Sequence, residues 1–250
     1  ANLTGSASVS MERSEFDRVH VFASRARLQF GDGRMRVDSM RLETSAATVT
    51  ADGSLGLHAG IADSLRFDAT VDSLGGLRPF LETRTALTTG TPDSLAGALS
   101  ITGMLTGNLD SLNVRGQIFG SSLYRNEDRG ASARGVVALD NILGIPRGTV
   151  GFELDTLVLG GVRVDTIGAE LQLSTRTSGT FQLGALSDNG PTFAAAGAVA
   201  RDSSRWTVTV QSVGLNLGSD AWTLAAPAAI RIEPALTAVD TLRLINGRGG

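Results

Sequence analysis

The chain lacks cysteine and lysine, and its 250 residues include only two histidines, two tryptophans and one tyrosine. Without cysteine there is no disulfide, no thiol nucleophile and no cysteine-ligated zinc site. The formal net charge is −3. This balance argues against a nucleic-acid partner, because such proteins carry a basic patch or stripe. Disorder is excluded as well, since 42% of the residues are hydrophobic and only 19% are charged.

Long hydrophobic runs are also missing. The longest stretch without a charged residue covers residues 94–109 and contains serine, threonine and asparagine. A membrane-spanning helix needs about 20 mostly apolar residues, so this stretch does not qualify. The chain begins without methionine or a signal-peptide pattern and ends in Gly-Arg-Gly-Gly. We therefore expect residues 1–250 to be one continuous segment of a larger protein, with an internal break near residues 72–92 as an alternative.

Alternation of apolar and polar residues dominates what remains. It is clearest in residues 25–30, 149–154, 167–174 and 206–211. Such a period of two predicts strands with one apolar and one polar face, and glycine- and asparagine-rich turns separate the runs. Helical periodicity is confined to residues 73–81, which hold two glycines and a proline. The sequence predicts an all-β antiparallel meander with at most one short helix.

A short motif of an apolar residue, aspartate, serine or threonine and a second apolar residue recurs, for example at residues 62–65, 109–112 and 164–167. Aspartate in such a setting commonly accepts hydrogen bonds from the backbone of a turn. An active site is needed only once, so repetition argues against catalysis. We interpret the motif as a turn that opens a strand.

Residues suited to chemistry are sparse. His20 and His58 lie outside any metal-ligand spacing, and nucleophile-elbow, phosphate-loop and calcium-loop motifs are absent. We predict no enzyme, no metal and no cofactor. A hydrolase would need an acid, a histidine and a serine grouped around His20 or His58, which the spacing does not suggest.

The apolar face of such a sheet must be hidden. We expect strands of six to eight residues, roughly 20–26 Å long, whose aliphatic side chains form an open groove without aromatic plugs. Trp206 and Trp222 are expected at its rim. The candidate lining residues are Leu28, Phe30, Val150, Phe152, Leu154, Leu171, Leu173, Val208, Val210, Leu215 and Leu217.

The same alternation fits a filled β-sandwich with a structural or adhesive role equally well. It fits an outer-membrane barrel less well, because such a barrel needs strands of about 9–11 residues and aromatic girdles.

The run Leu-Gly-Gly-Leu-Arg-Pro-Phe-Leu at 74–81, the strands at 95–99, 103–109 and 113–116, and the ending Ala-Trp-Thr-Leu-Ala-Ala-Pro-Ala-Ala-Ile at 221–230 together resemble the TamB branch of the AsmA-like family. The resemblance extends from about residue 65 to the end of the chain, continuing through 242–247.

That resemblance implies a bacterial envelope protein whose long, taco-like antiparallel sheet forms a hydrophobic groove for phospholipid. It implies a periplasmic location, an anchor in the inner membrane and an outer-membrane barrel of the Omp85 type as partner. The function expected is a passive conduit for phospholipid acyl chains between the two membranes.

Overall fold

The computed structural model describes residues 4–16, 19–77, 95–125, 128–159, 162–188, 190–202, 205–233 and 236–247. These residues form one sheet of 18 strands and a short 3-10 helix. The elements are β1 (Gly5–Met11), β2 (Ser14–Phe16), β3 (Val19–Gly31), β4 (Arg34–Thr44), β5 (Thr48–Gly56), β6 (Asp63–Val71), η1 (Leu74–Leu77), β7 (Leu95–Asn108), β8 (Ser111–Arg125), β9 (Asp128–Asp140), β10 (Arg147–Leu159), β11 (Val162–Thr175), β12 (Ser178–Leu186), β13 (Thr192–Asp202), β14 (Arg205–Leu217), β15 (Asp220–Leu224), β16 (Ala228–Glu233), β17 (Leu236–Val239) and β18 (Leu244–Asn246).

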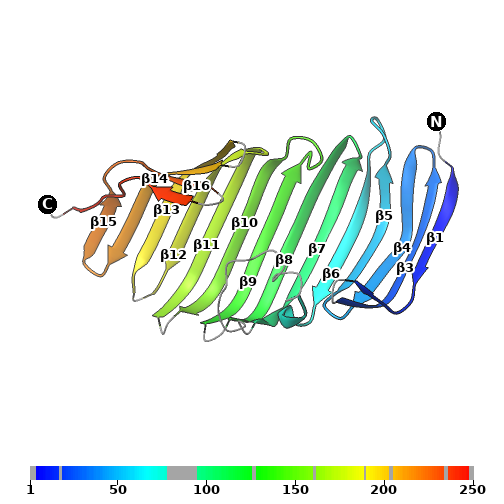
Figure 1. The fold of residues 1–250 in the computed structure, drawn as a ribbon, viewed down its shortest axis with the longest axis horizontal. Helices are drawn as coiled ribbons and strands as arrows, with labels where there is room; N and C mark the ends of the chain where they lie inside the picture. The colour runs from blue at the N-terminus through cyan, green and yellow to red at the C-terminus, as the bar shows by residue number, and fades with distance from the viewer. Residues whose placement is uncertain are drawn as a thin grey trace.

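The sheet is an antiparallel meander. From β3 to β14 each strand pairs with the next along the chain, and β1 and β2 both lie along β3. Figure 1 shows these strands side by side in one long, curved layer that does not close into a barrel. The prediction of an all-β, open and curved antiparallel sheet is confirmed.

The C-terminal end departs from the simple meander. One end of β14 pairs with β15, and its other end pairs with β16. In Figure 1, β16 turns back across the face of the sheet. The long, open layer therefore ends in a fold-over.

Strand length was predicted wrongly. β7, β8 and β11 are 14, 15 and 14 residues long, which corresponds to roughly 45–50 Å at about 3.3 Å per residue. The apolar alternation in these strands is interrupted by glycine, as at Gly116 and Gly120 in β8. A strand that continues through glycine looks like two short ones in the sequence.

The Asp-Ser/Thr motif is only partly a turn. Asp110 lies in the β7–β8 turn, and Asp63 opens β6. Asp38, by contrast, is an extra residue inside β4, because Arg27 pairs with Ser39 while Leu28 pairs with Val37. Asp155 and Asp165 also lie inside strands. The turn interpretation is wrong at these three positions.

The predicted short helix corresponds to η1, where Leu74 is buried. Residues 78–94 lie outside the described part, and with them most of the predicted break at 72–92. β6 pairs directly with β7, so the sheet continues across this segment. In the described residues no helix has the length and hydrophobicity required to cross a bilayer.

The molecule exposes 15879 Å² of surface. A compact protein of this mass would expose about 10,500 Å², so the chain exposes about half as much again. Within the described ranges a small core lies in the N-terminal half, where Val37, Ala51, Leu55, Leu65 and Leu112 pack together. The excess surface is what a single layer with an uncovered face produces.

Candidate functional site

One face of the sheet is apolar from end to end. Directly opposite residues of paired strands point to the same face, so each face can be followed across the sheet. The row of paired residues that runs from Leu28 in β3 to Val239 in β17 contains only aliphatic residues and glycine. It runs through Leu28, Val37, Gly53, Leu65, Leu105, Val114, Leu139, Gly148, Leu173, Gly179, Val199, Val208, Ile230 and Val239.

The neighbouring rows on this face have the same character. One carries Val150, Leu171 and Val210, and the next carries Phe152 opposite Ala169. Leu154 connects through Ile167, Ala185 and Phe193 to Leu215. Phe30 and Leu217 continue the alternation of Leu28 and Leu215. The register thus places all eleven candidate lining residues on one face, which we call the trough face.

The opposite face is mainly polar, although Phe119 and Val136 are also exposed on it. The row that includes Asp52 carries charged, hydroxyl, amide and small side chains, with Met104 the one large apolar exception. It runs through Asp52, Arg66, Met104, Arg115, Ala138, Thr149, Gln172, Thr180, Ala198, Thr209 and Ala229.

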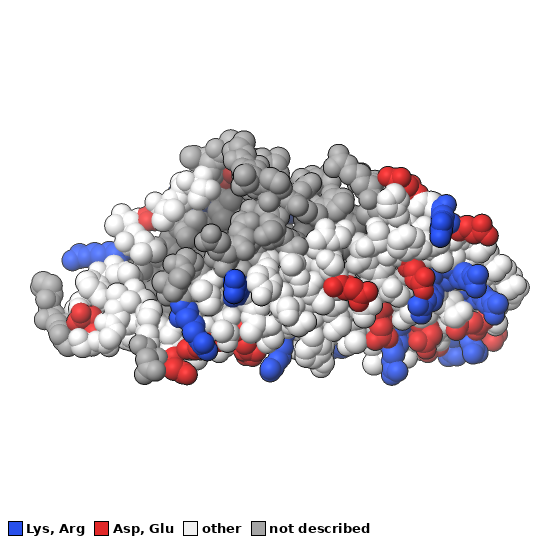
Figure 2. Space-filling view, turned by 90° about the horizontal axis from the view of Figure 1, so that it is seen from below, with Lys and Arg blue, Asp and Glu red and all other residues white. Residues whose placement is uncertain are grey.

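Charges of both signs alternate on this face. Arg36 Nε lies 2.9 Å from Asp38 Oδ1, and Arg115 Nη2 lies 2.6 Å from Asp140 Oδ1. Figure 2 shows arginine and acidic side chains intermingled over the N-terminal strands. Such exposed pairs add at most about 1 kcal/mol each, so their main effect is to keep this face hydrated.

The trough face divides into three stretches. In the N-terminal stretch the sheet curls far enough for side chains to meet, and Leu28 packs against the small core formed by Val37 and its neighbours. In the middle stretch the apolar side chains of the described strands are exposed to solvent: the exposed fraction is 37% for Ile118 and 48% for Phe152. The candidate residues of the first stretch therefore contact protein, whereas Phe152 faces solvent.

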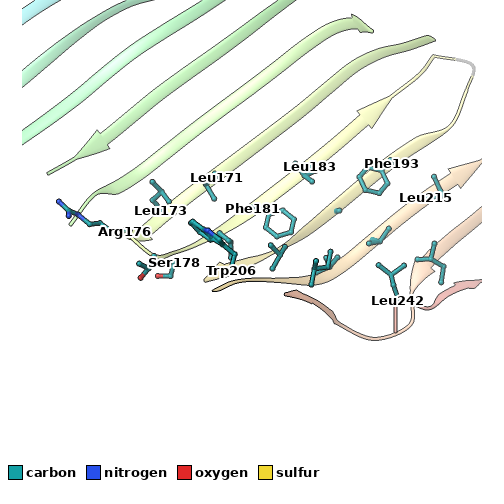
Figure 3. A pocket seen from close by; sticks show the side chains of 18 residues that line it. Leu171, Leu173, Arg176, Ser178, Phe181, Leu183, Phe193, Trp206, Leu215 and Leu242 are labelled. Atoms are coloured by element: carbon teal, nitrogen blue, oxygen red, sulfur yellow. The ribbon is translucent and has the colours of Figure 1, made fainter. Parts of the chain in front are cut away.

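The C-terminal stretch is roofed over. Ile230 of β16, Leu242 and Leu244 line a half-open cavity of about 660 Å³ together with trough-face residues of β11–β14. Figure 3 shows apolar side chains projecting into it from several strands. Leu171, Leu173, Val208, Val210 and Leu215 line this cavity, while Leu217 lies at the exposed end of β14.

The expectation of a groove without aromatic plugs is wrong for the C-terminal cavity. Phe181, Phe193 and Trp206 line the cavity. The Phe181 ring lies over Gly197, where an added Cβ would come within 2.8 Å of the ring. Trp206 stacks beneath Arg201, with 5.3 Å between the guanidinium carbon and the ring centroid.

Sequence reasoning missed several lining residues, namely Phe181, Leu183, Phe193, Ala195, Val213, Ile230, Leu242 and Leu244. The alternation of Phe181 and Leu183 was a usable signal. The fold-over that brings Leu242 and Leu244 onto β11–β14 left no local signal, because it joins residues about 60 positions apart.

Titratable groups are scattered. Across the described ranges, no three histidine, aspartate or glutamate residues come together as a metal site would require. His20 is exposed, with its Nδ1 3.8 Å from a Glu15 carboxylate oxygen. The His58 ring lies over Gly33, and its Nδ1 is 3.4 Å from the carbonyl oxygen of Ala59.

Two aspartates of the recurrent motif are perturbed. The Ser54 hydroxyl and the Ser64 backbone NH donate to Asp63 and lower its pKa, and Arg34 adds to this effect. The pKa of Asp165 is lowered by the backbone NH of Asp188 and by Arg163. Both carboxylates tie loops or neighbouring strands together.

Comparison of the chain with protein-family models, with curated proteins and with solved structures gives no match. The function is therefore inferred from the geometry of the trough face.

Proposed function

We propose that the chain is a passive conduit for the acyl chains of phospholipids. The observation that supports it best is the continuous apolar face of the described strands, whose side chains are exposed over β8–β12 and which is backed by a mainly polar face. Exposed apolar patches of this extent are uncommon on soluble proteins and generally mark a binding surface. Acyl chains would supply the packing partners that the protein itself does not provide.

The energetics favour a lipid in such a trough. Moving hydrocarbon out of water is favourable by about 0.8 kcal/mol per CH2 group. A lipid that crossed water unprotected would lose that amount for each methylene group of its chains. Aliphatic rows without hydrogen-bonding groups offer nearly equivalent positions, so the chain can move from one row to the next.

The structure modifies the expectation of an even path. The N-terminal stretch is partly filled by its own side chains, and the C-terminal stretch is roofed. The proposed lipid path is therefore open in the middle and restricted at both ends. Transfer through the whole segment would require these restrictions to open.

We place the conduit in the periplasm, between an inner-membrane anchor and an Omp85-type outer-membrane barrel, on the resemblance to the TamB branch alone.

The rival role, a structural or adhesive protein without lipid, requires no cargo. The described residues form one sheet with no second sheet facing it, so these residues do not form the filled sandwich that this rival invoked.

Extraction of the purified protein and mass spectrometry of the extract test the proposal. We expect phospholipid to copurify with the wild-type chain and to be reduced in Ile118→Asp, which places a carboxylate on the exposed part of the trough face, outside the C-terminal cavity. Gln117→Asp is the matched control, because Gln117 is exposed on the opposite face of the same strand. Absence of lipid from the wild type, or equal loss in both variants, would contradict the conduit.

A further inference from the structure

The N-terminal edge of the sheet is an unprotected strand. Among the described residues β1 pairs along one side, with β3, and in Figure 1 it is the outermost strand at its end of the sheet. All seven residues of β1 are exposed, and none of them is charged or a proline. Its register with β3 contains no bulge. Natural sheets protect such an edge with charges, proline, bulges or short strands, so this edge is suited to accept another strand.

The opposite end of the sheet is protected. Its strands β15, β17 and β18 are five, four and three residues long, and β16 turns back across the face of the sheet. Short edge strands and covered edges prevent strand addition. Head-to-tail stacking of copies would require both ends of the sheet to pair, whereas a twofold dimer uses the same edge twice. The two unlike ends therefore favour pairing of β1 with β1 of a second copy.

The sequence of β1 is complementary to itself when two copies run antiparallel. With Ser8 on the twofold axis, Ser8 lies opposite Ser8 of the second copy. In the same register Ala7 lies opposite Val9, and Ser6 lies opposite Ser10. Directly opposite residues point to the same face, so serine meets serine on one face and apolar residues meet on the other. Like charges directly opposite each other destabilise a strand pair, and β1 carries none.

We propose that two copies of the chain associate through β1, paired antiparallel about a twofold axis at Ser8. Ala7 is paired with Leu28 of the trough face, and Ser8 is paired with Arg27 of the polar face. The junction therefore keeps both faces in phase, and the two trough faces become one. A pair of seven-residue strands is a small interface, so the dimer is weak and depends on concentration.

Two double variants that differ in the sign of one charge test this register. Residue 7 of each copy lies opposite residue 9 of the other, so Ala7→Lys with Val9→Lys places like charges opposite each other twice. Ala7→Lys with Val9→Glu is the matched control, because it removes the same apolar side chains but places opposite charges together. Sedimentation equilibrium should show a concentration-dependent dimer for the wild type and the control. The dissociation constant of the like-charge variant should be at least about tenfold higher than that of the control.

Single cysteines test the position of the twofold axis, since the chain has no cysteine of its own. Directly opposite Cα atoms in an antiparallel pair lie about 4.5–5.5 Å apart, within the range that a disulfide spans. Ser8→Cys should therefore form a disulfide-linked dimer under mild oxidation. Ser6→Cys is the control: the two residues 6 are displaced by four positions, roughly 13 Å along the strands, and should not crosslink.

These outcomes are independent of the conduit, because none of the measurements involves lipid. A wild-type chain that stays monomeric at every concentration, equal dissociation constants for the two charge variants, or equal crosslinking from residues 6 and 8 would overturn the β1 dimer. Each of these results would leave the lipid proposal standing. Absence of copurifying phospholipid from a chain that dimerises as described would remove the conduit and leave the dimer.

Discussion

At the residue scale, glycine shapes the trough face as much as the large side chains do. Gly103 and Gly116 face each other across β7 and β8, and the Phe67 ring lies over Gly103. An aromatic ring that covers a glycine on the adjacent strand stabilises a sheet, because it supplies the packing that the glycine lacks. Aromatic residues on this face therefore stabilise the sheet itself, and the expectation of a groove without aromatic plugs overlooked this role.

This arrangement predicts opposite effects for two glycine substitutions. Gly103→Ala would place a Cβ 2.8 Å from Phe67 Cε1, so we expect a loss of about 1–3 kcal/mol in the free energy of unfolding from overpacking. Gly168→Ala is the control, since nothing lies within 4 Å of its added Cβ. It should leave stability unchanged or raise it by about 0.5 kcal/mol. Urea denaturation measures both, and a neutral Gly103→Ala would contradict the packing described.

Asp63 predicts a pH dependence of stability. Its carboxylate accepts from the Ser54 hydroxyl and the Ser64 backbone NH, which holds its pKa below the ordinary value. A lowered folded-state pKa stabilises the protein above the unfolded-state pKa of about 3.9, and this contribution disappears as the pH falls through the folded-state pKa. Asp63→Asn should lower the urea midpoint at pH 7, and the difference from wild type should vanish in acid. Ser54→Ala should also lower the urea midpoint at pH 7, but by less. If the difference in midpoint between Asp63→Asn and wild type did not depend on pH, the stabilising role of the Asp63 carboxylate would be refuted.

At the scale of elements, the sequence predicts the faces better than the extents. The alternation in residues 149–154 and 167–173 assigns the correct face to each of these residues in β10 and β11, because period two is a local property of the backbone. The length of a strand depends on the strands that pair with it. β8 continues through Gly116 and Gly120 because β7 and β9 pair with it on both sides. Bulges depend on neighbours too, which is why Asp38 resembled a turn.

The bulge in β4 predicts which deletions the sheet tolerates. Asp38 is an extra residue relative to both β3 and β5, so its deletion should straighten the ladder without exchanging the faces. Deletion of Thr102 from the regular ladder of β7 should exchange the faces of half the strand, since a slip of one residue does so. Circular dichroism should show a folded chain with a cooperative thermal transition for the first variant and loss of that transition for the second. Equal tolerance of both deletions would contradict the register.

At the scale of the whole molecule, the chain is one layer thick over much of its length. A compact protein of 250 residues has a radius of gyration of about 18 Å. A layer of more than a dozen strands spaced about 4.8 Å apart spans roughly 60 Å, so small-angle scattering should give a clearly larger value. A value near 18 Å would mean that the sheet folds onto itself in solution.

The candidate site shows the same limit of sequence reasoning at this scale. The eleven lining residues were chosen from local alternation, and the register places them on one face. What alternation could not reveal is the division of that face into packed, open and roofed stretches. That division depends on the curl that brings Leu112 onto Val37 and on the fold-over that brings Leu242 onto β11–β14. Both join residues distant in the sequence.

The measurement that tests the account most directly is photo-crosslinking from two adjacent positions in β10. Phe152 and Glu153 are both exposed, but they lie on opposite faces of the sheet. A photoreactive side chain at 152 should label phospholipid in the expressing cell, and the same side chain at 153 should not. Equal labelling from both positions, or labelling from neither, would contradict a trough that holds acyl chains on its apolar face.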